Sequence, residues 1–323
     1  MSSYLSLSTD ASTFGLSAAV TAAMVTQASD MIDSYLRRPE GLIYALDAGG
    51  APGWMTNLTA SLTLTTTEAI SAGDNVSVAV APGFYANTTD IVGEVFVLDR
   101  TGAHPEVVVV ASVQPWDVQP GHIILENVAY SHASGVTLER GLVIFEERKM
   151  PHKRTMTMLA RNHIARIIAG QGRYGYPRRS ESVAGLYNEV NLLASLSTFG
   201  GPAQWVRWDV RQASISPETG ELWVPAGIML AFYTDVRLRY IAGFTSANLP
   251  HPIKQATANI AAAIAALPRE LSTGIVKRMK AGDTEIERFA PSGATGRGAS
   301  AQNSLIDVNT RALLDPYRVR AFV

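Results

Sequence analysis

Residues Phe232–Pro268 read FYTDVRLRYIAGFTSANLPHPIKQATANIAAAIAALP. Between Val236 and Tyr240 every second residue is apolar, which is the period of a half-buried β-strand. After a turn that contains glycine, Pro252 suits the first turn of a helix and Pro268 ends it. The residues of one helical face recur three to four positions apart; they are Ile253, Ala256, Thr257, Ile260, Ile264 and Leu267. The stretch therefore predicts a strand that leads into a helix with a closely packing face.

The charges of the chain are sharply segregated, although its net charge is only −1. Residues 45–147 contain twelve Asp and Glu against two Arg, and residues 148–179 contain nine Lys and Arg and no acidic residue. One interpretation is that the two surfaces neutralise each other within or between subunits. The other is that the protein handles a polyanion, because an acidic wall repels a DNA backbone and a basic strip attracts it.

Length and composition limit the possible classes of protein. A chain of 323 residues is long enough for about two domains, and 47% apolar with 17% charged residues is typical of a globular protein. The absence of cysteine excludes disulfides and zinc sites with cysteine ligands, and it fits a reducing cytoplasm. We expect no signal peptide, because no basic region precedes the alanine-rich N-terminal stretch. We expect no membrane span, because no stretch approaches the roughly 18 apolar residues that one requires.

The first half of the chain predicts one helix followed by short strands. The helix Ser17–Arg38 ends before Pro39, and its apolar face consists of Val20, Met24, Ala28, Met31 and Tyr35. Turn residues separate the β-segments that follow; these are Leu58–Thr66, Val76–Val80, Gly93–Leu98, Glu106–Val113, His122–Glu126 and Leu142–Glu146. Short strands at this spacing suggest a small antiparallel barrel or sandwich.

The second half of the chain predicts helices and one hairpin. Helices are expected at Arg161–Ala169, Ser182–Leu196 and Arg269–Lys280. A β-hairpin is expected around the turn at 216–220, with Trp205–Arg211 and Ala213–Ile215 before the turn and Leu222–Val224 after it. The Gly/Ser/Ala-rich residues 291–304 are typical of a flexible linker.

A basic loop that interleaves arginine with tyrosine is expected after residue 172. Its members are Arg173, Tyr174, Tyr176, Arg178 and Arg179. Such a segment can stack on and neutralise nucleic acid. Tyrosine and arginine are equally enriched in protein interfaces, and we favour an interface.

Three short segments from both ends of the chain share their order and spacing with a known family. They are Tyr240–Phe244 with Leu249-Pro250 and Ile253–Ala256, then Leu313–Arg318, and Ala28–Leu36 near the start. On these residues the chain resembles the head–tail connector (adaptor) proteins of tailed bacteriophages. The β-segments between Val92 and Val136 also resemble a β module of phage structural proteins.

The resemblance implies an α+β fold, in which a helical connector core with a β-hairpin carries an inserted small antiparallel β-barrel or sandwich. The expected division is connector core at 1–48, inserted β domain at 49–149, connector core at 150–290, and linker with a C-terminal arm at 291–323. The resemblance further implies a homo-oligomeric ring, commonly dodecameric, in the neck of the virion between portal and tail. The subunit would be made in the host bacterial cytoplasm.

The partners implied by the resemblance are the portal protein and tail or neck proteins. Double-stranded DNA would pass through the lumen without sequence-specific binding, and no membrane would be involved. The residues implied for ring and portal contacts are Tyr35, Tyr240, Phe244, Ile253, Lys254, Asp315, Pro316, Tyr317 and Arg318. Residues 305–323 would form an arm that docks into the portal; the alternative is that they fold back on their own subunit.

The sequence motifs of common enzymes are missing, so we expect no enzymatic activity, cofactor or metal. There is no nucleophile elbow, P-loop or dinucleotide fingerprint, and His152 and His163 are too far apart in sequence to share a metal on one helix. Two other classes stay open. The chain could be another virion component, such as a tail-completion or baseplate protein, or a hydrolase that binds glycans.

Overall fold

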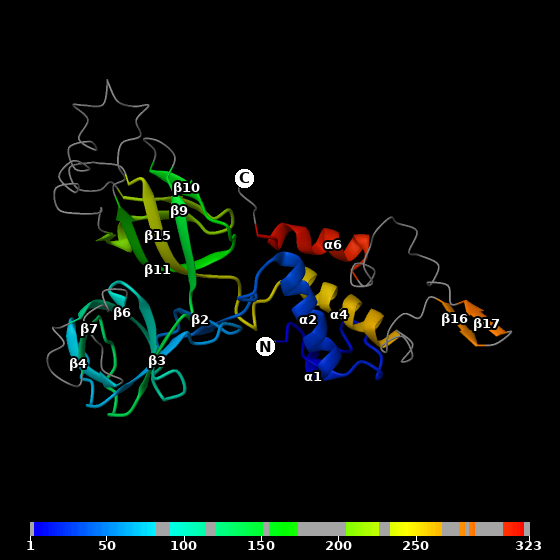
Figure 1. Cartoon of the computed structure of the whole chain (residues 1–323), viewed down its shortest axis with the longest axis horizontal. Coiled ribbons are helices and arrows are strands. Elements are labelled where there is room, and N and C mark those ends of the chain that lie inside the picture. Colours follow the sequence, from blue (N-terminus) through cyan, green and yellow to red (C-terminus); the bar gives the residue numbers. More distant parts are fainter. Residues whose placement is uncertain are drawn as a thin grey trace, which may run out of the picture. The chain divides into compact units, whose positions relative to one another are not determined.

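The computed structural model describes residues 3–81, 91–113, 121–150, 155–173, 205–225, 233–266, 278–281, 284–287 and 306–319. The chain forms two compact units (Figure 1). The first, here called the helical unit, combines Met1–Arg38 with Leu249–Arg318. The second, here called the β unit, contains Pro39–Asn248. The helical unit is therefore built from both ends of the sequence.

The helical unit is organised around one central helix (Figure 1). Its helices are α1 (Leu7–Asp10), α2 (Ala22–Leu36), α4 (His251–Ala266) and α6 (Val308–Leu314), and the 3-10 turn η6 (Asp315–Tyr317) follows α6. Helix α4 packs against both α2 and α6. It buries Ile253, Ala256, Thr257, Ala258, Ile260 and Ala261, so its predicted position and most of its predicted face are confirmed.

The buried face of α2 differs from the predicted one. The buried residues are Val25, Ala28, Ser29, Ile32, Asp33 and Leu36, whereas Met24, Met31 and Tyr35 are only half-buried. The reason is that Ser29 and Asp33 have polar partners inside the unit. The N–H of Tyr4 donates to Ser29 Oγ at 3.1 Å, and the Tyr4 hydroxyl donates to Asp33 Oδ1. A hydrophobic pattern does not reveal a buried face that contains satisfied polar side chains.

A closed antiparallel barrel forms part of the β unit (Figure 1). Its strands are β3 (Leu62–Thr66), β4 (Val76–Ala81), β5 (Val95–Leu98), β6 (Glu106–Val113), β7 (Gly121–Glu126) and β8 (Thr137–Arg140). They are joined in the order β3-β4-β7-β6-β5-β8. The barrel is filled by apolar side chains, including Leu64, Val78, Phe96, Leu98, Val108, Ile123 and Leu125. A barrel is one of the two architectures predicted for this stretch, although β8 was not predicted.

Two further sheets of the β unit share one core. One has the order β12-β11-β15-β9 and consists of β9 (Ile144–Lys149), β11 (Ile164–Arg173), β12 (Val206–Trp208) and β15 (Asp235–Ala242). The other has the order β10-β14-β13 and consists of β10 (Met156–Met158), β13 (Ser214–Ser216) and β14 (Glu221–Trp223). Their shared core includes Leu159, Leu222, Leu238 and Tyr240. The 3-10 turn η3 (Val210–Gln212) precedes β13.

Two glycines of β11 let aromatic rings pack directly on the backbone of the strand. A Cβ atom on Gly170 would lie 2.2 Å from the Trp208 ring, and one on Gly172 would lie 2.4 Å from the Tyr233 ring. Both approaches are closer than any non-glycine residue allows, so these positions need glycine for space.

Two smaller pairs of strands complete the described chain. Strands β1 (Tyr44–Leu46) and β2 (Pro52–Met55) pair antiparallel in the β unit. Strands β16 (Arg278–Ala281) and β17 (Thr284–Glu287) form an antiparallel hairpin.

The predicted fold class is wrong, because the described chain is mostly β, and the described part of 150–290 consists of strands with α4 as its one α-helix. The clearest error is Arg161–Ala169, which was predicted as a helix and lies largely in β11. The pairing of β11 with β15 shifts between Ile164 and Arg166 and again between Ile167 and Ala169. These irregularities break the two-residue alternation and place isoleucines at a spacing that imitates a helix. Residues 278–280, also predicted as helical, lie in β16.

Other predictions along the chain are confirmed or lie outside the described residues. The strand before α4 is β15, and the predicted hairpin is β13 with β14 around its turn. The predicted segment at 205–211 contributes β12 to a different sheet. The predicted helix Ser182–Leu196 and the predicted linker 291–304 lie outside the described residues.

Candidate functional site

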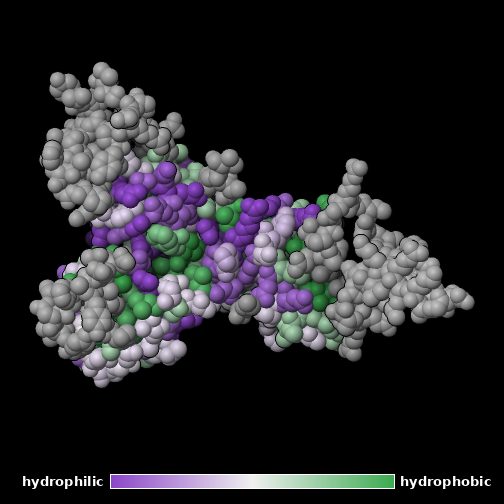
Figure 2. Space-filling view, viewed as in Figure 1, coloured by the Kyte–Doolittle hydropathy of each residue, from purple (hydrophilic) through white to green (hydrophobic). Residues whose placement is uncertain are grey.

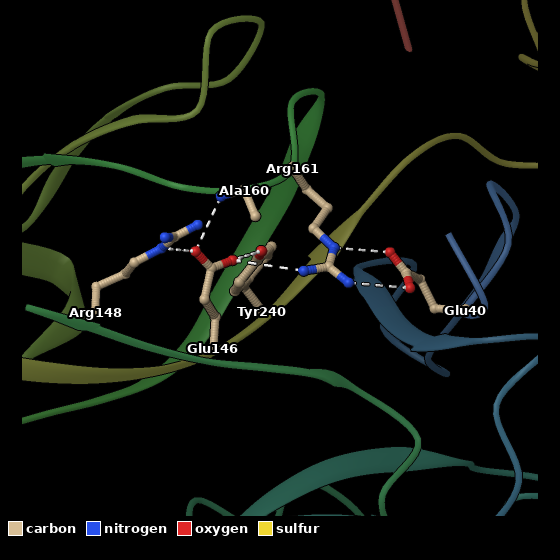
Figure 3. A network of polar contacts seen from close by, with 6 residues as sticks. All are labelled: Glu40, Glu146, Arg148, Ala160, Arg161 and Tyr240. Carbon is tan, nitrogen blue, oxygen red and sulfur yellow. Dashed lines mark hydrogen bonds and ion pairs between the residues drawn. The ribbon is translucent and has the colours of Figure 1, made fainter. Parts of the chain in front are cut away.

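A buried polar network lies in the β unit, centred on Glu146 of β9 (Figure 3). The Oε1 atom of Glu146 accepts from the backbone N–H of Ala160 at 2.9 Å and from Nε of Arg148. Its Oε2 atom accepts from the Tyr240 hydroxyl and lies 3.9 Å from Nη1 of Arg161. Glu146 is thus held by partners on both carboxylate oxygens.

Arg161 extends the network to Glu40. Its Nε and Nη2 atoms donate to the two carboxylate oxygens of Glu40 at 2.9 and 3.3 Å. This two-pronged geometry matches the planar guanidinium to a carboxylate. Because Glu40 follows Arg38 and Arg161 precedes β11, the pair ties the start of the β unit to its main sheet.

Strand register brings Glu146 and Tyr240 together. Strands β9 and β15 pair antiparallel, with Ile144 opposite Tyr240 and Glu146 opposite Leu238. Residues two apart on paired strands share a face, so the Glu146 and Tyr240 side chains project to the same side. The exposed fraction is 7% for Glu146, 3% for Glu40 and 0% for Tyr240.

The electrostatics of the network favour neutral tyrosine and charged arginine. Burial, followed by the charge and the hydrogen bond of Glu146, raises the pKa of Tyr240 well above its ordinary value. Burial by itself would lower the pKa of Arg161, but the hydrogen bond and charge of Glu40 outweigh it and the pKa is raised. The network therefore has two carboxylates and two guanidiniums, with a tyrosine that stays protonated.

This arrangement is suited to holding strands together and not to acid–base chemistry. The carboxylates of Glu146 and Glu40 are engaged by arginines, a tyrosine hydroxyl and a backbone N–H, and both are buried, whereas a general base must reach the proton of a bound substrate. In the described ranges no group of three or more His, Asp or Glu is placed to hold a metal ion. No helix of the described chain is long and apolar enough to cross a membrane.

A second buried cluster joins the barrel strands to a loop. The Nε2 atom of His132 lies 2.7 Å from Oε1 of Glu106, and its Nδ1 atom lies 3.4 Å from Oδ2 of Asp99. Glu106 also accepts from the N–H groups of Ala129 and Tyr130, at 2.7 and 3.3 Å. The His132 side chain is 1% exposed. The cluster fixes the loop between β7 and β8 onto the start of β6.

The described arginines of the basic stretch pair with carboxylates inside the β unit; two of these carboxylates belong to the acidic stretch 45–147 and two lie outside it. From the basic stretch, Arg148 pairs with Glu146, Arg161 with Glu40, Arg166 with Asp47 and Arg173 with Asp235. Hydrophilic residues gather over the sheet that contains β9, β11 and β15 (Figure 2). These pairs favour the interpretation that the charges neutralise each other within the subunit, and they disfavour a basic strip that binds a polyanion.

Arginines of the four-stranded sheet also pair with acidic residues at the barrel. Nη1 of Arg207 on β12 donates to Glu126 of β7 at 2.6 Å, and Nε of Arg239 on β15 donates to Glu94 at 2.7 Å. Both contacts use two guanidinium nitrogens. The barrel and the sheet are thus linked by charge pairs as well as by apolar contacts.

In the helical unit, three of the predicted contact residues meet at one surface. The Tyr35 hydroxyl donates to Oδ1 of Asp315 at 2.6 Å, and the Arg318 guanidinium lies 5.3 Å from the centroid of the Tyr35 ring. Desolvation and the neighbouring Asp315 raise the pKa of Tyr35. This cluster connects the end of α2 to η6, although the two segments are separated by most of the sequence.

The other predicted contact residues are scattered. Ile253 is fully buried in the helical unit and Tyr240 in the β unit, so neither presents its side chain at the surface of the single chain. Lys254 lies 3.5 Å from Asp10, and the Phe244 ring lies 4.9 Å from that of His163. Pro316 and Tyr317 lie in η6 beside the cluster; burial raises the pKa of Tyr317.

The C-terminal segment packs on its own chain. Leu314 is fully buried and Thr310 is 1% exposed. The Asn259 side chain on α4 donates to Thr310 Oγ1 at 3.4 Å, and Asp307 begins α6 by accepting from the Thr310 N–H at 2.7 Å. This is the alternative to a detached arm that the sequence left open.

Of the predicted basic loop, only Arg173 is described. Its guanidinium pairs with Asp235 at 3.1 Å and lies 4.8 Å from the centroid of the Trp205 ring. Tyr174, Tyr176, Arg178 and Arg179 lie outside the described residues.

Sequence reasoning did not find Glu40, Glu146, Arg161 or His132. Tyr240 and Glu146 are 94 positions apart and Arg161 and Glu40 are 121 apart, so no local pattern links them. The chain matches no protein-family model, no curated protein and no solved structure.

Proposed function

We propose that this chain is a structural subunit of a homo-oligomeric ring in the neck of a tailed bacteriophage, between the portal and the tail. Its partners are other copies of itself, the portal protein and tail or neck proteins. Double-stranded DNA passes through the lumen without sequence-specific contacts. The proposal gives the subunit no catalytic chemistry.

The observation that carries the proposal is the assembly of the helical unit. The segments Ala28–Leu36, Ile253–Ala256 and Leu313–Arg318 resemble the connector family and come from distant parts of the sequence. They lie in α2, in α4 and in α6 with η6, which pack together in one unit. Tyr35 and Asp315 join the first segment to the last. The Tyr240–Phe244 part of the resemblance lies in the β unit, so the helical unit gathers only the other quoted segments.

The ion-pair networks of the β unit support a structural role in preference to a catalytic one. Their carboxylates are occupied by arginines and backbone N–H groups. Such networks fix strands in one register at the cost of desolvating charge. A rigid subunit is what repeated contacts around a ring require.

The test of the proposal is the assembly state of the purified chain, alone and with portal protein. Native mass spectrometry and negative-stain images are expected to show a closed ring of one symmetry. A trimeric or hexameric assembly would favour a tail-completion or baseplate protein. A chain that stays monomeric with portal at every concentration would contradict the proposal.

A point variant tests the Tyr35 cluster as part of the portal or ring contact. Arg318→Glu reverses an exposed charge beside Tyr35, and we expect it to weaken ring or portal association without unfolding the chain. Arg211→Glu, at a side chain that is 89% exposed in the β unit, is the matched control. Equal effects of the two variants would remove this surface from the proposal.

A further inference from the structure

Strand β9 forms an open edge of the four-stranded sheet. It pairs with β15 on one side, and no strand of the described chain pairs with its other side. The N–H of Met150 bonds to the carbonyl of Thr234, and the antiparallel alternation continues from that pair. The backbone groups of Phe145, Glu147 and Lys149 therefore point away from the sheet.

An exposed aromatic side chain lies on this edge. Phe145 is 52% exposed, whereas its neighbours Ile144 and Glu146 are buried. Soluble proteins protect edge strands with charges, prolines or covering segments, because unpaired backbone groups invite another strand. Glu147 and Lys149 supply charge, but Phe145 leaves an apolar side chain near the start of the edge. This combination is typical of a site for strand addition.

A buried N–H group beside Phe145 lacks an acceptor. Arg239 is 4% exposed, binds Glu94 through Nε and Nη2, and lies 5.0 Å from the centroid of the Phe145 ring. Its Nη1 atom is buried and has no hydrogen-bond partner among the described residues. Buried donors are normally satisfied. The polar packing beside Phe145 is thus incomplete in the single chain.

The hairpin of β16 and β17 has outer strand edges that are unpaired in the described chain. Its two strands pair only with each other in the described chain, and a hairpin of two short strands is marginally stable by itself. The register places Met279 opposite Ile286, Arg278 opposite Glu287 and Lys280 opposite Glu285. The sequence thus alternates apolar and charged pairs, which suits a hairpin that adds to an existing sheet.

We propose that the β16–β17 hairpin of one copy of this chain adds to the outer edge of β9 in a second copy, with position Ile286 of β17 in register with Phe145. This inference rests on the proposed ring, in which every interface would join one hairpin to one edge. The four-residue strands of the hairpin are long enough to cover Phe145–Arg148 within the six-residue edge. Backbone hydrogen bonds would provide affinity, and the apolar pair would provide register.

The absence of cysteine from the chain makes disulfide cross-linking a direct test. Phe145→Cys and Ile286→Cys are prepared as separate proteins, mixed and oxidised. Because a disulfide needs Cβ atoms within about 4.5 Å, only touching positions react efficiently. We expect a mixed dimer that forms at least about tenfold faster than the control mixture of Val308→Cys with Ile286→Cys. Val308 is 78% exposed and controls for random collision.

The outcomes separate this inference from the ring itself. Rings in native mass spectrometry with no cross-link above the control would overturn the inference and leave the ring proposal standing. A chain carrying both cysteines that cross-links only within itself, while the mixed single variants do not react, would show that the hairpin covers its own subunit and would also overturn it. A protein that is monomeric under every condition would remove the ring proposal and the inference together.

Discussion

Glu146 illustrates how one buried carboxylate can determine the register of a sheet. Its partners Arg148, Ala160, Arg161 and Tyr240 come from β9, from the loop before β11 and from β15. Replacing the charge removes the ion pairs of Glu146 with Arg148 and Arg161 and the carboxylate that accepts from the Tyr240 hydroxyl. Removing one partner of a buried ion pair typically costs about 3–5 kcal/mol. The position should therefore tolerate neither Gln nor Ala.

We predict that Glu146→Gln lowers the free energy of unfolding of the β unit by about 3 kcal/mol. The matched control is Glu147→Gln on the same strand, whose side chain is 39% exposed and pairs with Arg237; exposed pairs contribute about 0–1 kcal/mol. Urea denaturation of the full chain measures both. Equal losses for the two variants would show that the network does not hold the sheet.

The raised pKa of Tyr240 predicts that the folded chain loses stability at alkaline pH. The folded pKa of Tyr240 is raised by burial and by Glu146 above the ordinary value of 10.0. The stability from this group is complete below pH 10, and it falls as the pH rises from there toward the folded pKa, because the unfolded chain releases its proton first. Tyr240→Phe should flatten this part of the stability curve. Unfolding measured between about pH 9 and 12 tests the assignment, and Tyr35→Phe, at a half-buried phenol of the helical unit, is the comparison for which a smaller change is expected.

At the scale of single elements, some parts of the fold could be read from sequence and others could not. Strand β15 and helix α4 were predictable because alternation and two prolines mark their limits. Strand β11 was not, because its irregular pairing disrupts the two-residue period. The buried face of α2 was missed because Ser29 and Asp33 look exposed until Tyr4 packs on them. Tertiary partners, which sequence periodicity does not contain, decided each error.

Some residues of the candidate site could likewise be named from the sequence, and others could not. Tyr35, Asp315 and Arg318 were named from the resemblance, and the structure brings them together. The Glu146 and His132 clusters were not predictable, because their members are isolated polar residues in strands and loops of different sequence regions. Only the fold supplies the contacts that make them a set.

Helix α6 is expected to depend on its own subunit for stability. Leu314→Ala removes a fully buried side chain and should cost the helical unit about 2–5 kcal/mol. Val308→Ala in the same helix, at a side chain that is 78% exposed, should cost much less. Thermal unfolding and hydrogen exchange of α4 amides report the difference. If Leu314→Ala leaves α4 protection unchanged, α6 does not contribute to the core.

At the scale of the whole molecule, charges that are segregated along the sequence become paired in the folded chain. The sequence has a sharp boundary between an acidic and a basic region, yet the described arginines of the basic region pair with carboxylates of the β unit. Neutralised arginines have little capacity to bind phosphates, because binding depends on releasing the counterions of DNA. The folded chain therefore lacks, within its described part, a continuous strip of unpaired arginines.

We predict that the isolated protein binds duplex DNA no more tightly than about 10⁻⁵ M at physiological salt, within the ordinary range of non-specific affinity. Weak wall contacts would let DNA move through a ring, since each phosphate that is neutralised adds affinity and friction.

Disrupting one internal ion pair gives a sharper comparison. Asp235→Asn frees Arg173 from its partner at 3.1 Å, and it should tighten DNA binding and steepen its dependence on salt. Glu221→Gln, at a half-buried carboxylate on β14, should change neither. Fluorescence anisotropy across a salt series measures these effects, and tight, steeply salt-dependent binding by the unaltered chain would contradict the neutralised surface inferred from the ion pairs.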